Sequence, residues 1–240
     1  MVDARNSIAL ALDLPLADGE RLLKAVGAHV GVAKVGLSLF VEHGPRAVEV
    51  IRGAKADVFL DLKLHDIPNT VELAAARASA LGVKYLTVHA GGGRQMLEAA
   101  VRGAESGAKA AAVAAPVVLA VTVLTSMNAA DLKGIGVSDP AAVQVERLAK
   151  LAKEAGAGGL VCSVQEVAAL RALLGRSMVL CTPGIRPAGA AAGDQARVDT
   201  PAAAVKLGAD LLVVGRPIYE ATDPAVAAKA IHDEVAGALG

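Results

Sequence analysis

Eight short apolar runs, separated by alanine-rich stretches with helical spacing, constrain the fold of this chain more than any other feature. The runs are Ile8–Leu12, Val30–Val35, Val58–Leu62, Tyr85–Val88, Val117–Leu124, Gly159–Cys162, Met178–Cys181 and Leu211–Val214. Nearly all are continuously apolar rather than alternating, which is typical of strands buried on both faces. Eight such β/α alternations in 240 residues predict an α/β fold, a (β/α)8 TIM barrel.

The stretches between the runs carry helix signals. We expect helices over Val71–Leu81, Arg94–Glu105, Ala141–Ala155, Val164–Leu174 and Pro224–Ala238. Asn69, three residues before Glu72, resembles a capping box. Asp139-Pro140 and Asp223-Pro224 each place a capping aspartate before a proline at the first helical position. The glycines expected to end helices are Gly82, Gly156, Gly175 and Gly208.

The competing architecture is a doubly wound open sheet, which would carry a GxGxxG turn after its first strand. The segment 13–16 has no glycine, and Gly91-Gly92-Gly93 does not match that fingerprint. No linker, low-complexity segment or charge block interrupts the chain, so we expect one domain over residues 1–240. The longest stretch without helix or strand signals is Pro183–Val198, and loops of this length are usually functional lids or disordered segments.

Composition excludes several classes of protein. Hydrophobic residues make up 54% of the chain, which excludes general disorder. Lys plus Arg and Asp plus Glu each number 24, so no basic surplus supports binding to nucleic acid or to an anionic membrane. The longest apolar stretch, 110–124, contains Pro116 and is shorter than the ~20 residues of a spanning helix. With no visible secretory signal, we expect a cytoplasmic protein, and its neutral apolar composition favours an oligomer.

Two cysteines, Cys162 and Cys181, lie in apolar strand-like runs without zinc or CxxC spacing. We therefore expect small buried hydrophobes rather than redox or metal-binding groups. His65 and His89 have no ligand partners at usable spacing, and we interpret them as packing or supporting residues. No cluster of His, Asp and Glu resembles a metal site.

Ionisable residues gather where the predicted strands end, which is the face that carries the active site in such barrels. Asp61 and Lys63 are two residues apart on one strand and therefore point to the same side, with Phe59. Lys34 on the neighbouring strand can reach the same space, and Asp66 follows on the next loop. Two lysines and two aspartates sum to zero charge, so the four can form either a catalytic group or a purely structural ion-pair network that closes the barrel. Asp66 alone could instead cap the turn into the next helix.

A phosphate site is predicted at the end of the eighth strand, at Gly215-Arg216. The loops after strands seven and eight are the usual phosphate site of these barrels. Backbone N–H groups near Gly215, the guanidinium of Arg216 and Gln195 would suit a phosphate dianion. The alternative is a turn glycine beside a surface arginine.

Residues 61–70, Asp-Leu-Lys-Leu-His-Asp-Ile-Pro-Asn-Thr, resemble the D-x-K-x-x-D-I-P-x-T signature of orotidine 5′-phosphate decarboxylase, in its bacterial form. The resemblance extends along the chain to residues 11–13, 34–36, 125–127, 183–187 and 213–218. No departure from the family pattern occurs at these positions.

The resemblance implies conversion of orotidine 5′-monophosphate (OMP) to uridine 5′-monophosphate (UMP) and CO₂ in de novo pyrimidine synthesis, with no cofactor and no metal. Lys63 would stabilise the carbanion at C6 and protonate it, while Asp61 would face the departing carboxylate and hold Lys63. Lys34 and Asp66 would complete the network. Family enzymes are homodimers in which the second aspartate of the signature, here Asp66, reaches into the partner's site.

The remaining substrate contacts follow from the same resemblance. The ribose would be bound by Asp13, near Lys34, and by Asp66 and Thr70 of the second subunit. The pyrimidine would be bound by Ser126, with Thr125 beside it. The phosphate would be bound by Arg186, Gln195, Gly215 and Arg216.

Two other functions remain as alternatives. A relative that shares D-x-K-x-x-D, 3-keto-L-gulonate 6-phosphate decarboxylase, uses Mg²⁺ and an enediolate, but the longer H-D-I-P-N-T match and the loop with Arg186 and Gln195 argue against it. A non-catalytic barrel that binds a phosphorylated metabolite would keep Gly215 and Arg216. It would have no need for both lysines and both aspartates.

Overall fold

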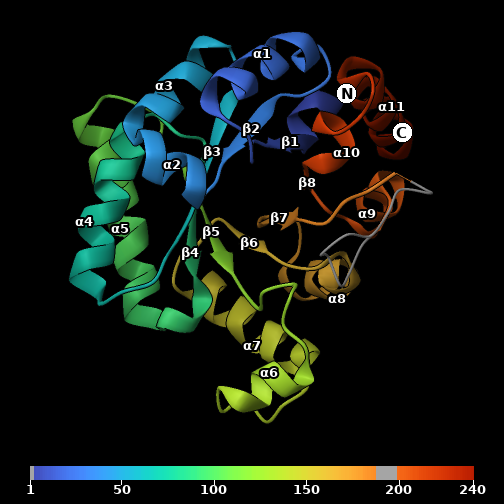
Figure 1. Ribbon diagram of the computed structural model, residues 1–240. Helices are drawn as coiled ribbons and strands as arrows, with labels where there is room; N and C mark the ends of the chain where they lie inside the picture. The colour runs from blue at the N-terminus through green and yellow to red at the C-terminus, as the bar shows by residue number, and fades with distance from the viewer. Residues whose placement is uncertain (1–2, 188–198) are drawn as a thin grey trace.

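A computed structural model describes residues 3–187 and 199–240, and within them eight parallel strands close into a barrel in chain order (Figure 1). The strands are β1 (Ile8–Ala11), β2 (Val32–Val35), β3 (Asp57–Leu64), β4 (Tyr85–His89), β5 (Val117–Val121), β6 (Gly159–Val161), β7 (Val179–Thr182) and β8 (Leu211–Val214). Pairing of β1 with β8 closes the ring. The predicted TIM barrel is confirmed.

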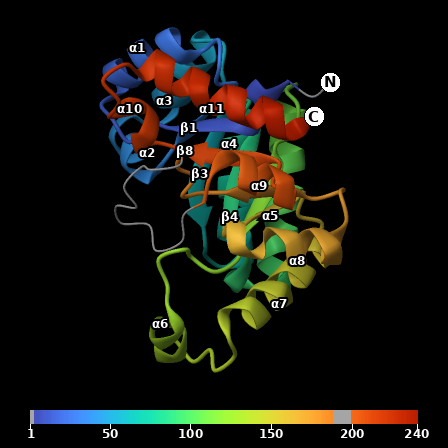
Figure 2. The same ribbon diagram turned by 90° about the vertical axis from the view of Figure 1, so that its right-hand side faces the viewer.

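Helices surround the barrel, and the short helix α6 projects away from it on the long connection from β5 to α7 (Figures 1 and 2). The helices are η1 (Ala4–Ser7), α1 (Leu16–Val26), α2 (Leu37–His43), α3 (Pro45–Gly53), α4 (Pro68–Ala80), η2 (Ala90–Gly92), α5 (Arg94–Ala110), α6 (Ala129–Gly134), α7 (Ala141–Glu154), α8 (Val164–Leu174), α9 (Pro201–Leu207), α10 (Arg216–Tyr219) and α11 (Pro224–Leu239). None of these described helices is long and apolar enough to cross a membrane.

The strands bury both faces, which explains their continuous apolar sequences. On β1, Ile8 and Leu10 pack outward against the helices, whereas Ala9 and Ala11 face the barrel interior. The interior cluster also contains Val32, Phe59, Tyr85, Leu119, Cys181, Leu211 and Val213. Both cysteines are buried, as predicted.

Helix ends agree with some sequence signals and correct others. Asp223 caps α11 by accepting from the backbone N–H groups of Ala225 and Val226. The four predicted stop glycines follow helices with positive φ: Gly82, Gly156, Gly175 and Gly208.

The capping box at Asn69 and the cap at Asp139 were wrong. Helix α4 begins at Pro68, two residues earlier than the box requires, with Ile67 as its N-cap. At α7 the N-cap is Pro140, and Asp139 lies outside the helix, where its carboxylate pairs with Arg147 at 2.5 Å. At α4 a proline sets the start of the helix, because its fixed φ suits the first turn.

Candidate functional site

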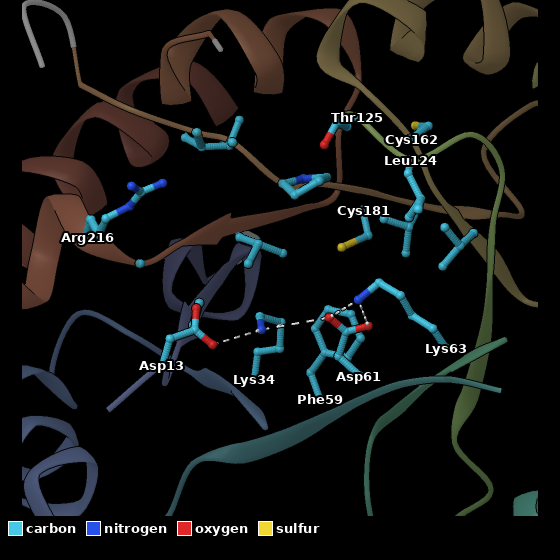
Figure 3. A pocket seen from close by; sticks show the side chains of 18 of the residues that line it. Asp13, Lys34, Phe59, Asp61, Lys63, Leu124, Thr125, Cys162, Cys181 and Arg216 are labelled. Carbon is cyan, nitrogen blue, oxygen red and sulfur yellow. Dashed lines mark hydrogen bonds and ion pairs between the residues drawn. The ribbon is translucent and has the colours of Figure 1, made fainter. Parts of the chain in front are cut away.

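A cavity of about 300 Å³ opens at the carboxyl ends of the strands (Figure 3). The structure brings eight of the predicted site residues to its wall: Asp13, Lys34, Asp61, Lys63, Thr125, Arg186, Gly215 and Arg216. They come from both halves of the chain, and barrel closure is what places them together.

Four of these side chains alternate in charge along the cavity floor; we call Asp13, Lys34, Asp61 and Lys63 the charge row (Figure 3). Lys63 Nζ lies 2.8 Å from both carboxylate oxygens of Asp61. Lys34 Nζ lies 3.7 Å from Asp61 Oδ2 and 3.7 Å from Asp13 Oδ1. Each charge therefore faces an opposite charge, which the desolvation of buried ions requires.

Burial differs along the charge row. The side chains of Lys34 and Asp61 are 12% and 11% exposed, whereas that of Asp13 is 58% exposed. Lys63 is intermediate at 31%. Lys34 and Asp61 are thus largely withdrawn from water, whereas Asp13 stands at the open mouth of the cavity.

The backbone of β3 departs from regular geometry at the charge row. Leu60 pairs with Leu86 of β4 and Leu64 pairs with Val88, so β3 uses more residues than β4 over this interval. Lys63 has φ +50°, a left-handed conformation that is rare for residues with a side chain. Strained backbone of this kind concentrates at functional sites.

Thr87 on β4 supports this irregular segment, and the sequence reasoning missed it. Its hydroxyl lies 2.9 Å from the backbone N of Lys63 and 2.9 Å from Asp61 Oδ1. The only sequence signal was one hydroxyl in the apolar run Tyr85–Val88.

Arginines occupy the other end of the cavity. Arg216 lies beyond Asp13 in Figure 3, far along the cavity from Lys63. Arg186 follows β7, and its backbone N–H donates to the Asp199 carbonyl at 3.0 Å. This hydrogen bond joins the two described ends of the loop after β7. Gly215 permits close packing, because a Cβ there would lie 3.3 Å from Ala11 Cβ.

Tyr219 of α10 also lines this end of the cavity, although the sequence reasoning did not select it. Burial raises the pKa of its phenol, and the carboxylates of Asp13 and Glu220 raise it further. The phenol is therefore a neutral hydrogen-bonding group at neutral pH.

Three predicted site residues do not line the cavity of their own chain. Asp66, Thr70 and Ser126 are all exposed. Asp66 Oδ1 accepts from the N–H of Ile67 at 2.6 Å, which resembles the turn-capping alternative. Gln195 lies outside the described residues.

The imidazoles of His65 and His89 are in contact, with ring centroids 5.4 Å apart. Burial lowers the pKa of His89, and the neighbouring His65 and Lys63 lower it further. His89 is therefore neutral at pH 7 and does not add positive charge beside Lys63.

Cys162 and Cys181 are both among the residues that line the cavity. Burial raises the pKa of both thiols, so they remain protonated at neutral pH. Across residues 3–187 and 199–240, no group of three His, Cys, Asp or Glu side chains has an arrangement that could hold a metal ion.

Comparison with known proteins gives consistent matches over nearly the whole chain. Residues 6–231 match the model of the Orotidine 5′-phosphate decarboxylase / HUMPS family. The orotidine 5′-phosphate decarboxylase of Anaeromyxobacter sp. (strain K) is 56% identical over 225 residues, which is 93% of this chain and 96% of the relative. That of Thermobifida fusca (strain YX) is 52% identical over 230 residues, 95% of each chain. The crystal structure of the enzyme from Lactobacillus acidophilus superposes with a TM-score of 0.85 at 40% identity, covering 96% of this chain and 99% of that one.

Proposed function

Because the chain belongs to the orotidine 5′-phosphate decarboxylase / HUMPS family, we propose that it converts OMP to UMP and CO₂ without a cofactor, with Lys63 as proton donor to C6. The family, the relatives and the barrel support the reaction itself, a step of pyrimidine biosynthesis. The observation that carries the assignment of roles is the charge row on the cavity floor, with Lys63 Nζ held 2.8 Å from Asp61.

The chemistry needs a cation beside the reacting carbon. When the bond from C6 to the carboxylate breaks, the electron pair stays on C6, and CO₂ leaves. The Lys63 ammonium stabilises that charge and then transfers a proton from Nζ to C6, which gives UMP and a neutral amine. Since Lys63 is 31% exposed, water can return the proton to the amine.

Asp61 and Lys34 prepare Lys63 for this role. Asp61 accepts from the Lys63 ammonium at both of its oxygens, so the Nζ position is fixed before substrate binds. In the proposed complex Asp61 faces the substrate carboxylate. Lys34 keeps the Asp61 charge balanced and lies near the ribose.

The phosphate would bind at the arginine end of the cavity, at Arg186, Gly215 and Arg216, with Gln195 contributing from the loop after β7. Asp13 would bind the ribose hydroxyls between the two ends, and Thr125 with Ser126 would bind the pyrimidine. Binding energy gained at the phosphate, remote from C6, can organise the site and raise kcat.

The proposal includes a homodimer in which Asp66 and Thr70 of one subunit enter the other subunit's site. Both residues are exposed and lie outside the cavity of their own chain. Between them Ile67 is 66% exposed, so a subunit contact there would bury its apolar side chain.

The test is loss of the ultraviolet absorbance of OMP with purified protein in EDTA. We expect rapid conversion to UMP. Activity that appears only with Mg²⁺ on a sugar-phosphate β-keto acid would instead assign the metal-dependent relative's function, and inactivity in both assays would leave a non-catalytic binding barrel.

Lys63→Ala tests the proton donor. We expect kcat to fall by at least about 10⁴-fold, because both the general acid and the stabilising cation are removed. UMP binding and the circular dichroism spectrum serve as controls and should be retained. A kcat near that of the wild type would refute the role of Lys63.

A further inference from the structure

Thr87 is a buried hydroxyl behind the wall of the catalytic cavity. It lies on β4 between Tyr85 and His89, is 0% exposed, and does not line the cavity. Thr87 therefore has no route to substrate. Anything it does for the reaction acts through the residues that it contacts, Asp61 and Lys63.

The irregular pairing of β3 with β4 creates the need for such a group. Between the pairs Leu60–Leu86 and Leu64–Val88 the ladder is interrupted, and the Lys63 N–H donates to a side chain of β4, that of Thr87. A backbone N–H that is shielded from water requires a partner. The Thr87 hydroxyl supplies it at 2.9 Å and thereby supports the left-handed conformation of Lys63.

The chemistry of the three groups fixes the direction of each hydrogen bond. The Lys63 N–H can only donate, so the Thr87 oxygen accepts there. The single hydroxyl proton is then free for Asp61 Oδ1, 2.9 Å away. Asp61 therefore accepts from the Thr87 hydroxyl as well as from the Lys63 ammonium.

We propose that Thr87 is a positioning residue for decarboxylation: its one hydroxyl fixes both the Asp61 carboxylate and the Lys63 backbone, and so aims the Lys63 ammonium at the reacting carbon. The inference rests on the proposed function of Lys63 and deepens it. A valine has nearly the same shape but leaves Asp61 Oδ1 and the Lys63 N–H without this partner.

The experiment compares Thr87→Val with Thr87→Ser. For Thr87→Val we expect kcat to fall by about ten- to a hundred-fold, as for loss of a hydrogen bond to a charged group. KM for OMP and Kd for UMP should change by less than about three-fold, because the phosphate and ribose contacts are untouched. Thr87→Ser keeps the hydroxyl, so its kcat should stay within about three-fold of the wild-type value.

Thr122→Val is the matched control. Thr122, directly after β5, is also buried, and its hydroxyl donates to the Val161 carbonyl at 3.1 Å rather than to a member of the charge row. The Thr122→Val variant should lose stability but keep the kcat of the wild type. If Thr87→Val fails to fold, Thr87→Ala removes the hydroxyl without added bulk and gives the same comparison.

Several outcomes would overturn the inference. These are an unchanged kcat in the variant without the hydroxyl, an equal loss of kcat in Thr122→Val, or no recovery in Thr87→Ser. If the wild-type chain does not decarboxylate OMP, the proposed function fails separately. In that case a crystal structure of Thr87→Val tests the geometry. A Lys63 Nζ that still lies 2.8 Å from Asp61 Oδ1 would refute the positioning role.

Discussion

At the scale of single residues, Gly36 shows that a glycine can be required for space rather than for conformation. Its φ of −85° and ψ of 178° are open to any residue. A Cβ at this position would lie 3.2 Å from Lys34 Nζ and 3.5 Å from Asp13 Oδ1. An added methyl group would therefore press directly on the charge row.

We expect Gly36→Ala to lower kcat/KM for OMP by about ten-fold, because a small displacement of a charged group is enough to misalign a site. Thermal stability should hardly change, since the backbone is not strained. Gly53→Ala is the control, as a Cβ there meets nothing within 4 Å. Steady-state kinetics of both variants measure the effect. Equal kcat/KM values would show that Lys34 can shift without impairing catalysis.

Three members of the charge row, Lys34, Asp61 and Lys63, were predictable from sequence as one network. The fourth predicted member was Asp66, where the structure has Asp13, and Thr87 was not predicted at all. Strand periodicity puts Asp61 and Lys63 on one side, and the barrel rule puts strand ends at the site. Thr87 depends on the register shift between β3 and β4, which no local pattern encodes. A threonine in an apolar run is indistinguishable there from any β-branched strand residue.

At the scale of elements, α4 and α5 pack closely against each other, and they follow β3, which carries Asp61 and Lys63, and β4, which carries Thr87. A Cβ at Gly103 would lie 2.2 Å from the Glu72 carbonyl oxygen, and one at Gly107 would lie 2.0 Å from that of Ala76. Both contacts are with backbone, which cannot rotate away. These two glycines therefore set the separation of the helices.

We expect Gly107→Ala to lower the free energy of unfolding by about 1–3 kcal/mol through overpacking. The matched control is Gly237→Ala in α11, where a Cβ meets nothing within 4 Å. This control should gain about 0.5–1 kcal/mol, as alanine is favoured in helices. Urea unfolding of the two variants measures the difference, and equal stabilities would show that α4 and α5 separate freely.

Strands were predicted better than helix boundaries because continuous burial on both faces leaves a strong signal. Even so, β3 continues to Leu64, beyond the predicted Leu62, and β5 ends at Val121, before the predicted Leu124. Both differences lie at the cavity. There Lys63 and Leu64 extend β3, and the segment after β5 leaves the barrel toward α6.

At the scale of the whole molecule, the cavity of one chain contains the charge row but not Asp66, so the proposed site needs a second copy. Asp66→Ala and Lys63→Ala chains test this when mixed. Each hybrid dimer would contain one site with Lys63 from one chain and Asp66 from the other, both native. Random pairing predicts recovery to about a quarter of wild-type activity from two nearly inactive parents.

The control is a mixture of Asp61→Ala with Lys63→Ala chains. These two residues share one cavity in one chain, with Lys63 Nζ 2.8 Å from Asp61 Oδ2, so no hybrid regains a complete site and activity should stay at the parental level. Subunit exchange is verified by mass labelling, and activity is followed by OMP absorbance. Recovery in the first mixture alone supports a site shared between subunits. Absence of recovery in both, with exchange verified, would mean that Asp66 acts within its own chain, where its bond to the Ile67 N–H would make it a turn-capping residue.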